Sequence, residues 1–457
     1  MNLDEPAAVP IVGHESAPFR RVLSLWALVL FGLAFVGPTA PFTFFGVGSQ
    51  TSHGHFALVY FIAMIAVSFT AISYGRMSAA FPEAGSAYAY AGRALHPVIG
   101  FFAGWVMLLD YILIPLLCVI IISANLAALV PVLPYSVCVL LSTALITAIN
   151  LRGIETTSHV TLIFNCVLAA AVTWFIVAAL HFLMFQRSLN AIAPVQAFYN
   201  PKTLRLSAIM AATPIAVLSF LGFDAISTLA EDAKDPQKNV GRATLLVCLI
   251  AGSLFILLSW LGQLIWPDYT HFVHAETAFA EIGRLIGGRH LYYVIEALVI
   301  AQAWASAITS QASASRLLFA MSRDGRLPKR LFGYVHPIRH TPIYTLLFIG
   351  AIAAGGAMLM GLEKAAQLVN FGACLGFMAV NFAVFNLYFV RRRRRRGTEF
   401  FKNLVAPCFG FLICFCIWLS ISEEAMLIGI CWSALGVLYY FAGRGKVKVG
   451  GQVAIEG

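Results

Sequence analysis

The chain has 457 residues, of which 60% are hydrophobic and only 11% are charged, and its formal net charge is +10. Soluble domains are about one quarter charged, so this composition excludes an ordinary soluble protein and indicates one that crosses a lipid bilayer many times. The basic residues follow the connections between apolar segments rather than one surface, so nucleic acid is not expected as a partner.

Apolar segments recur along the whole chain. A spanning helix needs about 20 apolar residues, and on that basis we expect about twelve spans. Their approximate ranges are 22–49, 56–80, 97–127, 134–151, 159–184, 206–230, 241–266, 290–320, 342–362, 364–390, 403–421 and 425–442. No small-residue cleavage site follows the first span, so we expect it to be retained.

The distribution of Lys and Arg predicts the orientation. The connections on one side hold most of the 30 basic residues, including the run Arg391–Arg396. The connections on the other side hold only Arg187, Lys202, Arg205, Arg284, Arg289 and Lys364. By the positive-inside rule we expect both tails, 1–21 and 443–457, to be cytoplasmic. The arginine run is interpreted as a stop-transfer anchor, with anionic lipid head groups as an alternative partner.

The first span is expected to be interrupted near Gly37. The stretch Val36-Gly-Pro-Thr-Ala-Pro41 contains two prolines three residues apart, and proline lacks an N–H and clashes with the preceding turn. An opened backbone exposes carbonyl groups that a ligand can use, so Gly37, Pro38 and Thr39 are candidate substrate-binding residues.

The sixth span carries the strongest functional signal. Ser219-Phe-Leu-Gly-Phe-Asp224 places an acid beside a glycine halfway along an apolar segment. An unpaired Asp at a helix centre costs about 2.5–3.5 kcal/mol on insertion scales, so such residues are functional by default. Asp224 is therefore a candidate amine counterion, proton acceptor or both, with helix-end capping as the structural alternative. Ser219, Phe220, Gly222 and Phe223 are candidate neighbours in the site.

Interruptions in the first and sixth spans point to an inverted repeat. We expect an all-α membrane protein in which spans 1–5 (22–184) and 6–10 (206–390) form a 5+5 inverted-repeat core, with spans 11 and 12 (391–442) added. This division rests on the positions of the interruptions, because no sequence identity between the halves is visible.

Several motifs resemble those of the amino acid–polyamine–organocation superfamily, and the chain is most similar to bacterial putrescine importers. The resemblance covers residues 22–444. The stretches that carry it are Ser219–Asp224, Glu231–Pro236, Tyr74–Tyr88, Ala314–Pro328, Phe332–Pro337 and Leu108–Tyr111. It implies secondary active transport of a small amine or amino acid by alternating access, coupled to protons.

Two departures bear on the substrate. Relatives that take amino acids have Gly-Ser-Gly in span 1, whose amides hold the substrate carboxylate, whereas Val36–Pro41 offers fewer donors. Putrescine importers carry an Asp near the position of Thr43, and a diamine needs an acid for each end. Glu296 is the candidate compensating anion, with a solvated interfacial position as its alternative.

Other candidates come from intramembrane polar and aromatic residues. Asp110 and Tyr111 lie mid-span. Asp110 is a candidate second charge, and Tyr111 is a candidate cation–π face. Trp105 is a candidate cation–π face as well. The pair Glu83 and Arg76 predicts an inner-gate salt bridge or a helix cap. Trp304, together with Phe220 and Phe223, is a candidate gate aromatic, with core packing as the alternative.

The sequence gives less information about the coupling ion. No lysine occupies span 5, where Leu168 stands near the position that holds one in many proton-coupled relatives. Span 8 offers the hydroxyls of Ser306, Thr309, Ser310 and Ser313, which can serve sodium or helix packing. The resemblance favours H+.

We therefore predict an importer of a small cationic amine, and an amino acid permease or exchanger is the rival within the class. A channel or a membrane-embedded enzyme is the alternative from another class, but the histidines lie at segment edges and no nucleophile–base or metal pattern appears. The nine cysteines show no metal-ligand spacing. No cofactor or metal is expected.

Overall fold

The computed structural model describes residues 21–130, 132–186, 195–272 and 278–443, and this part of the chain is helical apart from its connections and one isolated bridge pair. The first half contains α1 (Leu25–Val36), α2 (Ala40–Thr51), α3 (Phe56–Ala80), α4 (Ser86–Ala94), α5 (Pro97–Leu129), α6 (Tyr135–Leu151) and α7 (Ile154–His181), which a π-helical turn, Phe182–Gln186, extends.

The second half begins with α8 (Leu206–Leu218) and the 3-10 helix η3 (Phe223–Leu229). It continues with α9 (Pro236–Ile265), α10 (Ala278–Arg323), α11 (Lys329–Phe332), α12 (Ile343–Leu359), α13 (Leu362–Val384), α14 (Thr398–Phe400), α15 (Ala406–Leu419) and α16 (Glu423–Gly443). Two π-helical segments, Phe385–Arg391 and Phe401–Val405, extend α13 and join α14 to α15.

Every expected span coincides with a helix. In the described residues, 9 helices are long and apolar enough to cross a membrane, and the bent pair α1 and α2 raises this number to 10. The shorter apolar helices α6 and α12 occupy the ranges expected for the fourth and ninth spans. Gly288 (φ 68°) interrupts α10, so a separate N-terminal helix precedes the eighth span there.

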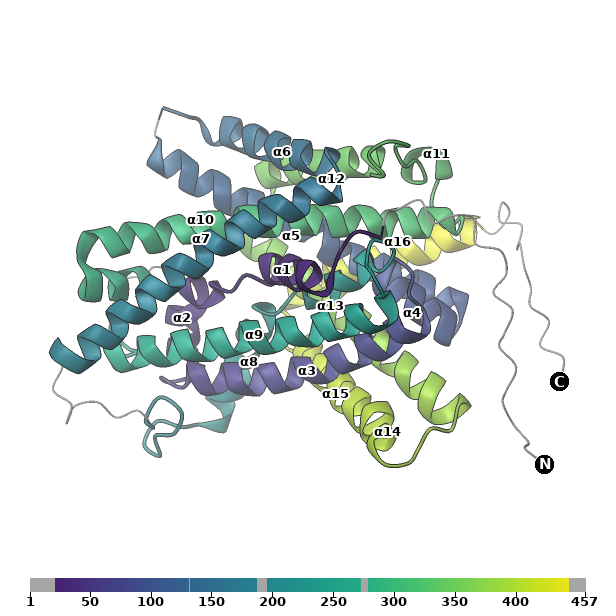
Figure 1. Ribbon diagram of the computed structural model, residues 1–457. Coiled ribbons are helices and arrows are strands. Elements are labelled where there is room, and N and C mark those ends of the chain that lie inside the picture. Colours follow the sequence, from purple (N-terminus) through teal and green to yellow (C-terminus); the bar gives the residue numbers. More distant parts are fainter. Residues whose placement is uncertain (1–20, 131, 187–194, 273–277, 444–457) are drawn as a thin grey trace.

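The helices lie side by side in one bundle, with α1 near its centre and α10 running along its length (Figure 1). α3 packs along α9, α5 packs between α10 and α13, and α6 packs against α12. We name the two ends of the bundle by their connections. The α4 end contains residues 81–86 and 231–235, and the α2 end contains residues 51–55 and 266–272; the α4 end is the one predicted to be cytoplasmic.

The polypeptide approaching α1 is joined to the end of the sixth span. Leu23 donates its amide to the Asp232 carbonyl (3.0 Å) and accepts from the Lys234 amide (2.8 Å). This short parallel bridge fixes the start of the first span beside the exit of the sixth at the α4 end. The two interrupted spans are therefore neighbours from this end to their breaks.

Candidate functional site

The first span breaks where the sequence predicts. α1 ends at Val36, Gly37 adopts φ 82°, and α2 starts at Ala40 with its axis bent by 45°. A Cβ on Gly37 would lie 2.9 Å from Gln302 of α10, so both the backbone angle and the space require glycine. Pro38 and Thr39 are buried beside it, and Thr39 is only 2% exposed.

Helix α10 satisfies the carbonyls that this break sets free. Ser306 donates its hydroxyl to the Phe35 carbonyl (2.8 Å), and Gln302 donates Nε2 to the Ala34 carbonyl (3.0 Å) and to the Ser306 hydroxyl (3.1 Å). A helix C-terminus buried in a membrane protein needs such partners because water is absent. The sequence named Ser306 as a polar residue of span 8 but gave no sign of Gln302.

The sixth span breaks against the first. α8 ends at Leu218, and Gly222 adopts φ 106° before η3 begins. A Cβ on Gly222 would lie 1.9 Å from the Phe35 ring, so no other residue fits without displacing that ring. The two interruptions, 185 residues apart in the chain, are thus in direct contact. Such paired discontinuities at the midplane are typical of transporter substrate sites.

Asp224 points into the interior beside Tyr111. Its side chain is 1% exposed, and its Oδ2 accepts the hydroxyl of Tyr111 at 2.6 Å. Its second oxygen, Oδ1, is buried and has no hydrogen-bond partner among the described residues. The Tyr111 hydroxyl also lies 3.4 Å from the Ser86 Oγ at the start of α4. Asp224 and Tyr111, which were predicted separately as site residues, are therefore brought together, although the two come from different halves of the chain.

A second buried acid accompanies Asp224. Asp110 is also 1% exposed, and its Oδ1 has no hydrogen-bond partner in the described part of the chain. The two carboxylates lie within electrostatic reach of each other, and neither forms an ion pair with a described basic residue. Burial of a charge without a partner is strongly unfavourable. Each acid is therefore either protonated or paired with a cation that the described residues do not supply.

Hydroxyls and aromatic rings surround the two acids. The hydroxyls of Tyr74, Tyr90 and Ser227 are buried and have no hydrogen-bond partner within the described residues. Tyr74 packs edge-on against Tyr90 (ring centroids 5.9 Å apart) and against Phe223 (5.8 Å). The sequence named Phe223 but did not single out Tyr74 or Tyr90, because tyrosines on an apolar face give no functional signal by themselves.

Ser219 and Phe220 lie on the α2 side of the break. Ser219 Oγ lies 2.9 Å from the Tyr60 hydroxyl, and the buried Phe220 packs edge-on against Phe255 at 5.0 Å. Thr43 is half-buried on α2. These positions lie between the break and the α2 end of the bundle.

The predicted Arg76–Glu83 pair does not form. Arg76 makes a bidentate contact with Glu399 of α14 (2.6 and 3.3 Å), whereas Glu83 pairs with Arg93 of α4 (3.0 and 3.1 Å). The prediction was wrong because closeness in the sequence favoured a local pair, while the fold brings α14 to the end of α3. Trp105 stacks on Trp432 of α16 at 4.9 Å, which favours a packing role over a cation–π role.

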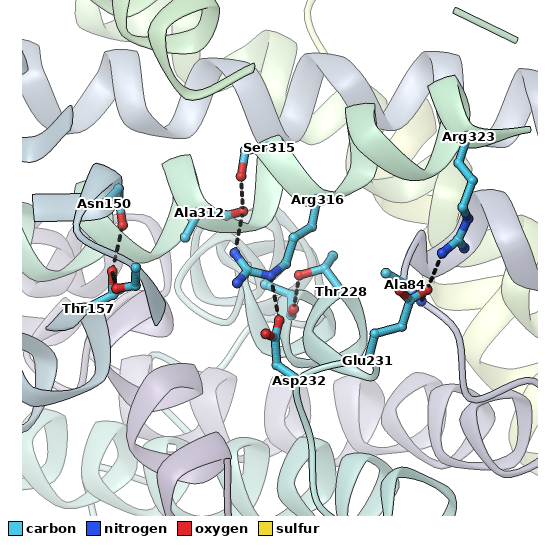
Figure 2. A network of polar contacts seen from close by, with 12 residues as sticks. Ala84, Asn150, Thr157, Thr228, Glu231, Asp232, Ala312, Ser315, Arg316 and Arg323 are labelled. Atoms are coloured by element: carbon cyan, nitrogen blue, oxygen red, sulfur yellow. Dashed lines mark hydrogen bonds and ion pairs between the residues drawn. The ribbon is translucent and has the colours of Figure 1, made fainter. Parts of the chain in front are cut away.

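Two other ion pairs close the α4 end (Figure 2). Arg316 donates Nε to Asp232 Oδ2 at 2.8 Å, and the two side chains are 3% and 1% exposed. Arg323 donates to Glu231 Oε1 at 2.7 Å, and the same oxygen accepts the Ala84 amide at 3.0 Å. These contacts join α10 to the end of the sixth span and to the connection before α4. These pairs join residues 84 and 92 positions apart, so they were not predictable from the sequence.

Aromatic packing closes the α2 side. Phe279, from the separate N-terminal part of α10, packs against Phe42 (4.6 Å), Phe45 (5.4 Å) and Phe175 (4.8 Å). With the ion pairs at the α4 end, this cluster encloses the central polar region on both sides.

The two remaining candidates, Glu296 and Trp304, lie on α10. Glu296 is half-buried, and ten residues, or about 15 Å of helix rise, separate it from Ser306. Trp304 is half-buried and stacks on no other ring of the described chain. Glu296 thus lies nearer than Ser306 to the α2 end of α10, and its role as a replacement for an acid at position 43 stays a prediction.

The geometry points to a family of transporters, and sequence comparison decides which. The profile of the amino acid permease family matches residues 28–455. The chain belongs to the amino acid permease family. This permease is 34% identical to the low-affinity putrescine importer PlaP of Escherichia coli K12, over 92% of this chain and 93% of the relative.

Other relatives of the permease have different named substrates. It is 27% identical to the methylthioribose transporter of Bacillus subtilis, over 93% and 94% of the two chains. It is 24% identical to the branched-chain amino acid permease BcaP of the same organism, over 92% of each. These relatives are transporters, so the permease is a multi-pass membrane transporter and not an enzyme, as the sequence predicted.

Proposed function

We propose that this permease imports a small cationic amine, of the putrescine type, by alternating access with proton symport. The observation that carries the proposal is the central pair of buried acids, Asp224 and Asp110, which have no basic partner among the described residues. A substrate ammonium supplies the missing charge, and the orphan oxygens accept its N–H groups. Two acids give one acceptor for each end of a diamine.

The backbone of the first break supports a substrate without a carboxylate. A carboxylate requires N–H donors, but Pro38 and Pro41 have none. The Gly37 amide donates to the Leu33 carbonyl (2.9 Å), and the Ala40 amide donates to the Gly37 carbonyl (2.9 Å). Thr39 is left as the one residue of this stretch whose amide can bind a ligand without breaking a hydrogen bond described here.

The contacts of α10 support a proton rather than sodium as the coupling ion. Sodium in a protein is held by oxygen atoms. The candidate ligands here are the carbonyls of Ala34 and Phe35, which the break leaves without helical partners next to Ser306. Both carbonyls already accept hydrogen bonds from Ser306 or Gln302. Asp224 remains as the group that can carry a proton in one step and bind an ammonium in the next.

The contact between the two breaks supports the division into repeats 22–184 and 206–390. In this scheme the breaks near Gly37 and Gly222 form the fixed site, and movement of one repeat against the other opens one end at a time. Opening the α4 end requires separation of Arg316 from Asp232 and of Arg323 from Glu231. We place the α4 end and both termini in the cytoplasm of a bacterium, as the basic residues predict.

The proposal is tested by uptake of radiolabelled putrescine into proteoliposomes with an imposed inward proton gradient. Asp224→Asn removes the charge and keeps the size, and truncating one side of a buried charge pair costs about 2–5 kcal/mol. Gradient-driven uptake is expected to fall by about 30-fold or more. Asp268→Asn is the matched control, because Asp268 lies in an exposed connection at the α2 end and its side chain is 56% exposed.

The second candidate is an amino acid permease or exchanger. It is favoured by the relative that is named for branched-chain amino acids and by Thr43, which stands where putrescine importers carry an Asp. Absence of putrescine uptake, with accumulation of a labelled amino acid that no diamine displaces, would overturn the amine proposal in favour of this one.

A further inference from the structure

The connection between the tenth and eleventh spans gathers a dense positive charge that transport does not use. Arg391–Arg396 are six consecutive arginines, all exposed, and Lys402 follows them. Glu399 is the single acid between residues 391 and 405, and it is already paired with Arg76 at 2.6 Å. The Arg394 side chain also lies within electrostatic reach of Glu399. This segment therefore keeps a large uncompensated positive charge.

The arginines lie in a compact turn and not on a regular helix. The Arg392 amide donates to the Leu387 carbonyl and the Arg394 amide donates to the Tyr388 carbonyl, both at 2.9 Å. Arg393 adopts φ 50°, which folds the chain back toward the end of α13. Several guanidinium groups are thereby concentrated in one place, and guanidinium binds phosphate oxygens in a bidentate manner.

Some of these arginine side chains interact with other residues of the protein, and others donate no hydrogen bond to a described residue. The Arg391 guanidinium donates to the Leu95 carbonyl (3.3 Å), and Arg395 donates to the Phe389 carbonyl (3.0 Å). Arg392 lies over the Tyr388 ring, 5.1 Å from its centroid. The side chains of Arg393, Arg394 and Arg396 donate no hydrogen bond to any described residue. The first group anchors the turn, and the second presents charge to a ligand.

Apolar rings beside the turn identify the ligand as a lipid. Phe400 and Phe401 follow the arginines directly and are 44% and 45% exposed, and Val390 before them is 43% exposed. These residues lie at the ends of spanning helices, where head groups meet acyl chains. A soluble anion would leave the rings in water, whereas a phospholipid covers them with its chains and gives its phosphate to the arginines.

We propose that the arginine turn, residues 391–396 with Phe400 and Phe401, is a binding site for an anionic phospholipid of the adjacent leaflet. A stop-transfer anchor requires positive charge alone. The folded turn, the three uncommitted guanidinium groups and the exposed rings beside them form a site instead.

The test is native mass spectrometry of the full-length protein with equal amounts of phosphatidylglycerol and phosphatidylcholine. Arg393→Gln, Arg394→Gln and Arg396→Gln together are expected to lower the ratio of bound phosphatidylglycerol to phosphatidylcholine by about tenfold or more. The matched control, Lys238→Gln, Lys329→Gln and Arg330→Gln, removes three exposed charges from the same end of the bundle. We expect the control to keep the wild-type ratio.

Three outcomes would overturn the proposal. They are an unchanged ratio in the arginine variant, an equal loss in the control, and displacement of phosphatidylglycerol by inorganic phosphate, which would identify the ligand as a free anion. Arg393→Lys, Arg394→Lys and Arg396→Lys together keep the charge but lose the bidentate donors, so this variant is expected to give a ratio between those of the wild type and the Gln variant. It thereby separates loss of the site from loss of the fold.

Discussion

Two pairs of buried acids in this permease differ in whether an arginine is paired with them. At the α4 end, Asp232 and Glu231 are buried and each meets an arginine, Arg316 at 2.8 Å and Arg323 at 2.7 Å. At the centre, Asp224 and Asp110 are buried as deeply but meet no described basic residue. A buried acid with an arginine has its charge balanced within the protein. A buried acid without one requires a cation from outside, which is the property a carrier of amines needs.

The comparison predicts that loss of Arg316 has the largest effect on stability. Arg316→Ala leaves Asp232 buried and unpaired, which typically destabilises a protein by about 3–5 kcal/mol. Thermal unfolding of the purified protein should show a large fall in Tm. The double substitution Arg316→Met with Asp232→Leu should recover most of it, because an apolar pair of similar volume replaces the ions. Equal Tm values for Arg316→Ala and the wild type would refute the assigned role.

Tyr111→Phe should weaken substrate binding without unfolding the protein. The Tyr111 hydroxyl orients Asp224 through a 2.6 Å hydrogen bond, and hydrogen bonds to charged groups contribute about 1.5–3 kcal/mol. We expect KM for the amine to rise by about tenfold or more in uptake assays. Tyr135→Phe is the control, because that hydroxyl donates to a carbonyl of α12 far along the chain from the site. An unchanged KM for Tyr111→Phe would argue against orientation of Asp224 by this residue.

Arg323→Ala should have a smaller effect than Arg316→Ala. The Arg323 side chain is 34% exposed, so water replaces part of its contact with Glu231 and the loss is about 1 kcal/mol. Because this pair closes the α4 end, the same variant should raise the reactivity of a cysteine introduced in the vestibule. A loss of Tm as great as that of Arg316→Ala would show that exposure does not distinguish the two pairs.

Asp224→Asn should have the smallest effect on stability. The amide oxygen still accepts the Tyr111 hydroxyl, and a buried uncompensated charge is removed. We expect the free energy of unfolding to stay within about 0.5 kcal/mol of the wild-type value or to increase, so that Tm is unchanged or higher. Differential scanning fluorimetry without substrate measures this directly. A large fall in Tm would mean that Asp224 is a structural acid, like Asp232.

Much of the fold could be predicted from the sequence, because its signals are local. Apolar length located the spans, and glycine and proline located the breaks at Gly37 and Gly222. Asp224 and Tyr111 were named for their chemistry, and the fold joined them. The contact itself was not predictable, since it links residues 113 positions apart.

The contacts that were predicted wrongly or overlooked share one physical cause. Arg76 was assigned to Glu83 by closeness in the sequence, but α14 brings Glu399 nearer. Gln302 was overlooked because its role depends on the free carbonyl of Ala34, which only the bend in span 1 creates. Pairings between distant helices depend on packing, and one sequence carries little information about packing.

The most direct test of the central claim is calorimetric titration of putrescine into the purified protein, compared with Asp224→Asn and Asp268→Asn. The account predicts that putrescine binds to the wild type and to Asp268→Asn with similar Kd values, and that Asp224→Asn binds it about 30-fold more weakly or not at all. Equal putrescine binding by Asp224→Asn would contradict the claim that this unpaired acid is the partner of the transported cation.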